Sequence, residues 1–282
     1  MNESLREKMD RLKCLLTEYG SVGVAFSGGV DSTFLAKASC NILGEKAVAI
    51  TVDSEAYPPW NVVETRTLAA LIGIRLIEIS ARACDIPGFS ENGPERCYYC
   101  KKALFSLMLA KAGEVGVSVL IDGSNADDRA DYRPGMRALS ELGVKSPLMG
   151  AGFTKNDIRS ISREFGLPTW DRQSFACLAS RFPYGNVITP ELLERTWRAE
   201  AVLKDMGMKR YRVRNHGNLA RIELDPEGMN VLFTDANARS RVVRSLKALG
   251  YIYAAIDLSG YRTGSMNEAL MNPGGISPEK SQ

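Results

Sequence analysis

The stretch VGVAFSGGVDSTFLAKASCNILG, residues 22–44, decides the fold that we expect for this chain of 282 residues. Its apolar run (22–26) is typical of a buried strand, the glycine turn SGGVDS (27–32) follows, and residues 33–44 have a helical pattern that ends at Gly44. A strand, a glycine turn and a helix in this order predict the first half of a βαβ unit.

The same alternation continues along the first part of the chain. Further strands are predicted at AVAITVD (47–53), IRLIEIS (74–80) and SVLIDGSN (118–125), with a helix at 61–73. Strands that are apolar throughout indicate an α/β fold with a parallel sheet covered on both faces. Because ligands bind at the carboxyl ends of such strands, the loops after residues 26, 53, 80 and 121 are expected on one rim.

The pattern changes near residue 185. A helix (188–207), a hairpin (209–224), a second helix (240–250) and a strand (251–258) predict a smaller α+β domain. We therefore expect a nucleotide-binding domain over 1–184, a substrate or oligomerisation domain over 185–262, and a mobile tail over 263–282.

Composition excludes several classes of protein. The chain is 45% apolar, which argues against global disorder, and it has no apolar run of about 18 residues that would span a membrane. Its charged N-terminal segment lacks a signal-peptide pattern, so we expect a cytoplasmic protein with reduced thiols. The net charge is only +3, although residues 195–250 carry 12 Lys/Arg and 6 Asp/Glu. That excess suits a phosphate-bearing partner or simply a solvated face.

The glycine turn is the strongest chemical signal. Gly28 and Gly29 let the backbone approach a ligand closely, and the helix that follows offers its amides to an anion. Ser27 and Ser32 add hydroxyl donors, whereas Asp31 would repel phosphate unless it held a cation. The ending of the Walker loop is absent. The alternative is an ordinary capped turn.

Three of the six cysteines form a second signal. Cys97 and Cys100 make a CxxC at the start of a predicted helix, and Cys177 lies in ACLASR. Three thiolates suit a [4Fe–4S] cluster with one open iron, while three unrelated reduced thiols remain the alternative. Cys177 could instead attack an activated carboxylate itself, helped by the nearby Arg181. We expect the other cysteines of helical patterns, Cys14 and Cys40, in the core, and leave Cys84 open.

SGGVDS after a buried strand resembles the PP-loop of the ATP pyrophosphatases. The resemblance implies that the loop grips the pyrophosphate of ATP with Mg²⁺, and that AMP is transferred to an oxygen of the substrate. A narrower resemblance rests on GSNADDRADYRPG (123–135), SPL (146–148), CLASR (177–181) and RVRNHGNLARIEL (212–224). These motifs resemble the LarE-type sulfur transferases of nickel-pincer nucleotide biosynthesis.

The LarE resemblance implies a substrate and a reaction. A carboxylate of pyridinium-3,5-biscarboxylic acid mononucleotide is adenylated, and sulfur then replaces the activated oxygen. In one branch a single cysteine at the CLASR position is sacrificed, and in the other three cysteines hold a cluster that passes on a sulfide. This chain has Cys97, Cys100 and Cys177, so we favour the cluster branch. The source of that sulfide stays open.

The resemblance also implies roles for single residues. The pyrophosphate and Mg²⁺ fall to Ser27, Gly28, Gly29, Asp31 and Ser32. Asp53 and Ser54 are expected to face the adenosine, and Asn125, Asp127 and Asp128 to bind the activated substrate. Lys101 is expected to stabilise the charge of the acyl-adenylate. The substrate's own phosphate falls to Arg181, Arg212 and Arg214, with Glu200 and Glu223 either orienting these arginines or binding a metal.

Rival functions share part of this pattern. A tRNA thiolation enzyme has the same loop and cysteines, but it needs a more extensive basic surface than a net charge of +3 provides. An ammonia-using ligase leaves the cysteines unexplained, and a regulatory nucleotide-binding module would release no pyrophosphate. We expect a homo-oligomer that acts on a small nucleotide.

Overall fold

The computed structural model describes residues 3–130, 134–173 and 176–262. Contacts divide the chain into two compact units, and each is described by itself. The first unit comprises Met1–Phe89 and Glu95–Phe175, and the second comprises Ser90–Pro94 and Ala176–Gln282. The division after residue 175 lies nine residues before the boundary expected at 184, and the expected tail 263–282 lies outside the described residues.

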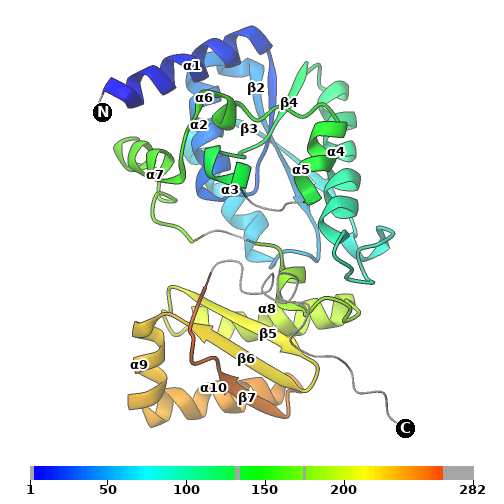
Figure 1. Cartoon of the computed structure of the whole chain (residues 1–282), viewed down its shortest axis with the longest axis vertical. Coiled ribbons are helices and arrows are strands. Elements are labelled where there is room, and N and C mark those ends of the chain that lie inside the picture. The colour runs from blue at the N-terminus through cyan, green and yellow to red at the C-terminus, as the bar shows by residue number, and fades with distance from the viewer. Residues whose placement is uncertain (1–2, 131–133, 174–175, 263–282) are drawn as a thin grey trace. The chain divides into compact units, whose positions relative to one another are not determined.

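The first unit alternates strands and helices. Its elements, shown in Figure 1, are α1 (Glu3–Tyr19), β1 (Val22–Ala25), α2 (Val30–Leu43), β2 (Ala47–Asp53), α3 (Trp60–Ile72), β3 (Arg75–Ser80), α4 (Arg96–Glu114), β4 (Val119–Ile121), α5 (Pro134–Glu141), α6 (Pro147–Ala151) and α7 (Lys155–Glu164). The strands form one sheet in the order β3-β2-β1-β4, and every pair is parallel. The expected parallel α/β fold is confirmed.

Alternate residues of each strand enter different cores. Ala47 and Ala49 of β2 pack in the cluster that includes α1 and α2, whereas Val48 and Ile50 pack in the cluster that includes α4. Successive side chains of a strand point to opposite faces, so a sheet with helices on both sides needs apolar residues throughout. Figure 1 shows helices on both sides of this sheet.

The sheet order places the site. The chain winds outward from β1 through β2 to β3, and then returns to add β4 on the other side of β1. The loops that follow β1 and β4 therefore leave neighbouring strands in diverging directions, which opens a crevice at the carboxyl ends of the strands. The glycine turn and the loop from Asp122 to Asn125 are these two loops.

Two expectations for helices of the first unit need correction. α2 begins at Val30 rather than at residue 33, which puts Asp31 and Ser32 in its first turn. Cys14 is exposed rather than in the core, because the buried side of α1 is formed by Leu5, Leu12 and Leu16. Cys40 is half-buried and packs against the core as expected.

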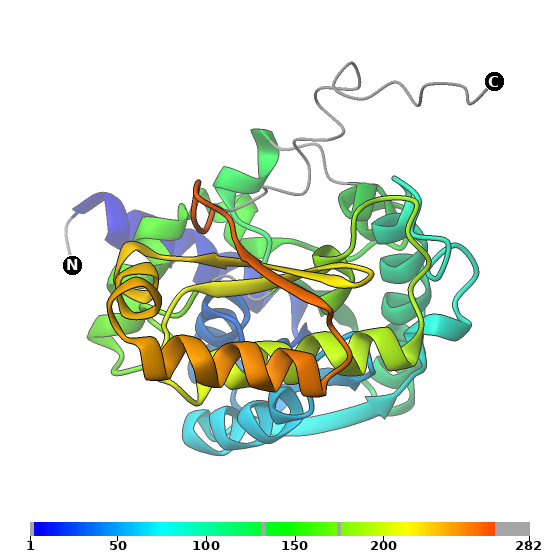
Figure 2. The same cartoon turned by 90° about the horizontal axis from the view of Figure 1, so that it is seen from below.

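The second unit is a small α+β layer, as expected. Its elements are a short 3₁₀ turn η4 (Leu178–Arg181), α8 (Pro190–Lys204), β5 (Tyr211–His216), β6 (Leu219–Leu224), α9 (Pro226–Thr234), α10 (Ala236–Ala248) and β7 (Tyr253–Ile256). The order is β5-β6-β7, with β5 and β6 antiparallel and β6 and β7 parallel. α8 and α10 pack on one face of this sheet (Figure 2). The helix α9 was not expected from the sequence.

No helix among the described residues is both long and apolar enough to cross a membrane.

Candidate active site

The glycine turn connects β1 to α2. Gly28 has a φ of +73°, a conformation that disfavours side chains, and a Cβ there would lie 3.2 Å from the Thr65 Cγ2 of α3. The Ser27 and Ser32 hydroxyl oxygens lie 3.1 Å apart. Gly29 is the N-cap residue of α2, and in the described structure no side chain caps the amides of the first turn. Uncapped helix amides beside two hydroxyls fit the oxygens of a pyrophosphate.

Asp31 lies in the first turn of α2 and faces two other segments. Its Oδ1 accepts a hydrogen bond of 3.5 Å from the side-chain amide Nδ2 of Asn125, and its Oδ2 pairs with the Lys155 ammonium. Burial, the largest influence, raises the pKa of the Asp31 carboxyl, although Lys155 opposes the rise. The site thus presents a carboxylate for which positive charge is favourable, as the expected Mg²⁺ role requires.

The loop after β4 holds itself in place with its own side chains. The Asn125 Oδ1 accepts a hydrogen bond of 3.0 Å from the backbone amide of Asp127. The Asp128 Oδ2 accepts one of 3.0 Å from the backbone amide of Asn125. These are the bonds of an Asx-rich turn. The Asp127 Oδ2 also accepts from the backbone amide of Lys155 at 2.8 Å. The structure therefore brings Asn125 and Asp31 together and ties this loop to the start of α7.

Lys155 is a residue that the sequence analysis missed. It is the first residue of α7, which begins with a capping box formed by Thr154 and Asp157. The motif T-x-x-D is a readable sign of a helix start. Its position opposite Asp31, 124 residues earlier in the chain, follows only from the tertiary structure.

Arg172 and Arg159 are two further cations that the sequence analysis missed. The Arg172 guanidinium donates a hydrogen bond of 3.1 Å to the carbonyl of Gly28 and lies 3.1 Å from a carboxylate oxygen of Glu64 in α3. Arg159 in turn donates to the carbonyls of Trp170 and Arg172, at 2.9 and 2.7 Å. Arg172 thus holds the peptide of Gly28, and α7 holds the segment that carries Arg172.

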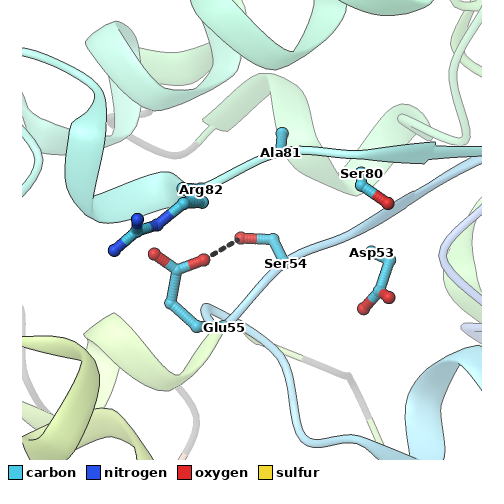
Figure 3. A pocket seen from close by; sticks show the side chains of 6 residues that line it. All are labelled: Asp53, Ser54, Glu55, Ser80, Ala81 and Arg82. Carbon is cyan, nitrogen blue, oxygen red and sulfur yellow. Dashed lines mark hydrogen bonds between the residues drawn. The ribbon is translucent and has the colours of Figure 1, made fainter.

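The carboxyl ends of β2 and β3 line an open pocket of about 320 Å³, drawn in Figure 3. Asp53 and Ser54, the residues expected to face adenosine, line it together with Glu55 and Arg82. The Glu55 carboxylate accepts from the backbone amides of Ala83 and Cys84 at 3.1 and 3.0 Å. Burial alone would raise the pKa of Glu55, but these amide donors lower it overall. Glu55, also missed, therefore stays ionised and ties the loop after β3 to the wall of this pocket.

Cys97 and Cys100 lie three residues apart in the first turns of α4, so one helical face carries both thiols. The buried Arg96 lies 3.8 Å from the Cys97 sulfur through its guanidinium nitrogen. Lys101 extends over the ring of Phe105 at 5.9 Å and along α5, where a Cβ on Gly135 would lie 2.6 Å from its Cδ. The structure shows no contact between Lys101 and the glycine turn among the described residues.

Cys177 belongs to the second unit, where it is the N-cap residue of η4 and half-buried. The convergence of Cys177 with Cys97 and Cys100 of the first unit stays a prediction. Among the described residues, no group of three or more His, Cys, Asp and Glu side chains gathers as a metal site.

The arginines expected to bind the substrate's phosphate lie in the second unit, beside two glutamates. Arg181 and Glu200 form a buried pair with N–O distances of 2.8 and 3.1 Å, and Arg181 also donates to the carbonyls of Ala176 and Cys177. Arg214 and Glu223 form a second pair, at 2.9 and 2.6 Å. Both glutamates thus lie where they orient arginines, one of the two roles left open for them.

Arg212 lies in the same buried group. Its side chain donates a hydrogen bond of 2.7 Å to the Tyr211 carbonyl, and its guanidinium lies 5.2 Å from the ring centre of Tyr261. Burial and then the Arg181 cation lower the pKa of Arg212 to about 10. It stays protonated at neutral pH in a setting where an added anion would be favourable.

The comparisons with known proteins identify relatives along nearly the whole chain. No family model matches the sequence. The chain is 39% identical over 266 residues to an uncharacterized protein of Synechocystis sp., and the match covers 94% of this chain and 99% of the relative. It is 35% identical over 271 residues to the pyridinium-3,5-bisthiocarboxylic acid mononucleotide synthase of Lactiplantibacillus plantarum, covering 95% and 96%.

More distant relatives match a shorter part of the chain. A glutamine-hydrolyzing GMP synthase component of Methanosphaerula palustris is 26% identical over 164 residues, 54% of this chain and 53% of the relative. GMP synthases belong to the PP-loop superfamily, the group that the turn SGGVDS of this chain resembles. Identity of 35% along nearly the whole of both chains shows that this protein belongs to the family of the pyridinium-3,5-bisthiocarboxylic acid mononucleotide synthases, the LarE family.

Proposed function

We propose that this protein is an ATP-dependent sulfur transferase. It adenylates a carboxylate of pyridinium-3,5-biscarboxylic acid mononucleotide and replaces an oxygen of that group by sulfur, in the biosynthesis of the nickel-pincer nucleotide. The observation that carries the proposal is the relationship to the Lactiplantibacillus synthase along 95% of the chain. The uncapped α2 amides beside Asp31 and Asn125 support it from the structure.

In the adenylation step, a carboxylate oxygen of the substrate bonds to the α-phosphorus of ATP, and the bond from that phosphorus to pyrophosphate breaks. Pyrophosphate leaves with the electron pair. The α2 amides and the hydroxyls of Ser27 and Ser32 donate to its oxygens. Mg²⁺, when bound, neutralises phosphate charge. Asp31 is the residue that would hold it, with its carboxylate oriented by Asn125.

In the second step, a sulfur nucleophile bonds to the acyl carbon and AMP leaves with the electron pair. Cys97, Cys100 and Cys177 have the donor chemistry of a [4Fe–4S] site, which would supply an open iron able to carry an added sulfide. The alternative makes the Cys177 thiolate itself the nucleophile, which forms a thioester as AMP leaves. Removal of the Cα proton of Cys177 then breaks its Cβ–S bond, which leaves dehydroalanine in the chain and the sulfur on the substrate as a thiocarboxylate. Arg181, Arg212 and Arg214 would hold the phosphate of the substrate in both cases.

The adenylation is tested with the purified full chain, ATP and pyridinium-3,5-biscarboxylic acid mononucleotide. We expect AMP and pyrophosphate to form only when the substrate is present, and a product in which sulfur has replaced oxygen. Asp31→Asn and Asn125→Ala should lose both activities, whereas Cys177→Ser should still adenylate. Pyrophosphate release that does not depend on this substrate refutes the proposal.

The source of sulfur is tested by anaerobic purification, with iron and sulfide analysis and intact mass before and after turnover. The cluster predicts about four irons per chain and an unchanged protein mass. A loss equal to hydrogen sulfide identifies Cys177 as the donor. Cys97→Ser separates the two further, because it removes a cluster ligand and leaves a sacrificial Cys177 intact. Cys14→Ser is the matched control, since Cys14 is an exposed cysteine of α1.

A further inference from the structure

Lys155 is held at both of its ends by carboxylates of the candidate site. Its ammonium pairs with the Asp31 Oδ2, and its backbone amide donates to the Asp127 Oδ2 at 2.8 Å. The side chains of Lys155 and Asp31 are 27% and 23% exposed, so a ligand that enters from solvent can reach the pair. Lys155 therefore pairs with the carboxylate that the proposed function gives to a metal ion.

Two cations cannot occupy the Asp31 Oδ2 together. A Mg²⁺ ion binds a carboxylate oxygen at about 2.0–2.1 Å, and an ammonium in hydrogen-bond contact with the same oxygen would repel it at close range. A divalent ion that reaches the Asp31 Oδ2 must therefore displace Lys155. The cost of displacing Lys155 is offset if the ammonium finds another anion nearby.

The backbone around Lys155 is anchored, so the side chain is the part that can move. The Thr154 hydroxyl and the Asp157 carboxylate complete the capping box of α7, and Asp157 also pairs with Lys8 at 2.6 Å. A lysine is a compact charge on a flexible stem of four carbons. Arg159, one turn further along α7, also acts electrostatically on Asp31, but its guanidinium already donates to the carbonyls of Trp170 and Arg172.

We propose that Lys155 is a catalytic residue that exchanges partners when ATP binds with its metal ion. In the nucleotide-free chain its ammonium neutralises Asp31 and excludes a divalent ion that arrives alone. When the ion arrives with ATP, Asp31 takes the ion and the ammonium moves to the phosphates, where it stabilises the charge that builds up on the departing pyrophosphate. The site thereby binds metal and nucleotide together rather than metal first. This inference rests on the proposed ATP chemistry.

The test measures Mn²⁺ binding to the full chain by electron paramagnetic resonance, without nucleotide or substrate. Lys155→Met removes the competing ammonium and should tighten Mn²⁺ binding about tenfold. Lys155→Arg keeps the competing charge and should stay close to wild type. Lys8→Met is the matched control, because it breaks another lysine pair of α7 that lies on Asp157 rather than on Asp31.

A second measurement follows the other half of the exchange. Lys155→Met should weaken the binding of ATP and of pyrophosphate in the presence of Mg²⁺ about tenfold, whereas Lys8→Met should not. Unchanged or weaker Mn²⁺ binding by Lys155→Met overturns the proposal. If that variant does not fold, Lys155→Gln is judged by the same outcomes. None of these measurements uses the pyridinium substrate, so a failure of the proposed sulfur transfer would be seen separately.

Discussion

Neutralising Glu200 should unfold the second unit far more readily than neutralising its neighbour Glu194. Both glutamates lie on α8, and both pair with an arginine at 2.8 Å. The two pairs differ in burial, because the side chains of Arg181 and Glu200 are 3% and 4% exposed and those of Arg198 and Glu194 are 54% and 51% exposed. The comparison therefore isolates the effect of burial on an ion pair.

The magnitude follows from what Glu200→Gln leaves behind. The Arg181 guanidinium would remain buried without a carboxylate, facing an amide that replaces one acceptor oxygen with a donor. Breaking one side of a buried pair costs about 3–5 kcal/mol. An exposed pair four residues apart contributes about 0.3–0.5 kcal/mol, so Glu194→Gln should change the free energy of unfolding by no more than that.

The dependence on pH has a definite sign. Burial is the largest single influence and raises the pKa of Glu200, but the charge and hydrogen bonds of Arg181, the charge of Arg212 and the Val213 amide together lower it overall. A carboxyl whose pKa is lower in the folded state than in the unfolded state stabilises the fold at pH values above its unfolded pKa, which is about 4.3 for glutamate. It loses that contribution as the pH falls through the folded pKa. The difference between wild type and Glu200→Gln should therefore be full at neutral pH and should shrink in acid.

The assay is unfolding in urea, monitored by the hydrogen exchange of peptides from β5 and β6. These peptides report the free energy of the second unit separately from that of the first. We expect Glu200→Gln to lose protection there and Glu194→Gln to keep it. If the two variants differ by less than about 1 kcal/mol, the buried pair does not stabilise the unit in the way that its geometry indicates.

Three further predictions concern single residues. Gly28→Ala should abolish ATP binding and cost about 1 kcal/mol of stability. Gly20→Ala should show only the loss of stability, because Gly20 has the same φ of +73° but nothing within 4 Å of its Cβ. Equal ATP affinities of the two variants in a binding titration would contradict this. Arg172→Met should weaken ATP binding about tenfold, because the Gly28 carbonyl loses its hydrogen-bond donor, and Arg172→Lys should restore part of the affinity. An ATP affinity of Arg172→Met that calorimetry finds unchanged would show that the glycine turn does not need this hydrogen bond. Arg212→Met should weaken binding of the substrate mononucleotide without destabilising the second unit. The lowered pKa of Arg212, about 10, indicates that burial disfavours its charged form in the folded unit. A marked fall in the urea midpoint of unfolding would count against this reasoning.

The sequence alone identified the strands, the glycine turn and the parallel sheet, since these depend on patterns within a few residues. The apolar run 22–26 and the turn after it became β1 and the loop to α2, and the hairpin at 209–224 became β5 and β6. Helix α9 was missed because only Gly228 and Leu232 are buried in it, which leaves no clear apolar period. Cys14 was misplaced because it was counted with the apolar residues of α1, although it lies two residues from both Leu12 and Leu16 and therefore off the buried side of the helix.

The candidate site was predictable in its residue types but not in its partners. SGGVDS indicated a phosphate loop with an ionised Asp31, yet the sequence did not reveal that Lys155 pairs with this carboxylate or that Arg172 holds the carbonyl of Gly28. In the second unit, the sequence left open whether Glu200 orients an arginine or binds a metal, and the structure pairs it with Arg181. Local patterns determine strands, turns and caps, because their bonds join residues that are close in the chain. Contacts between side chains more than a hundred residues apart depend on how the sheet order brings loops together, and only the folded chain decides that.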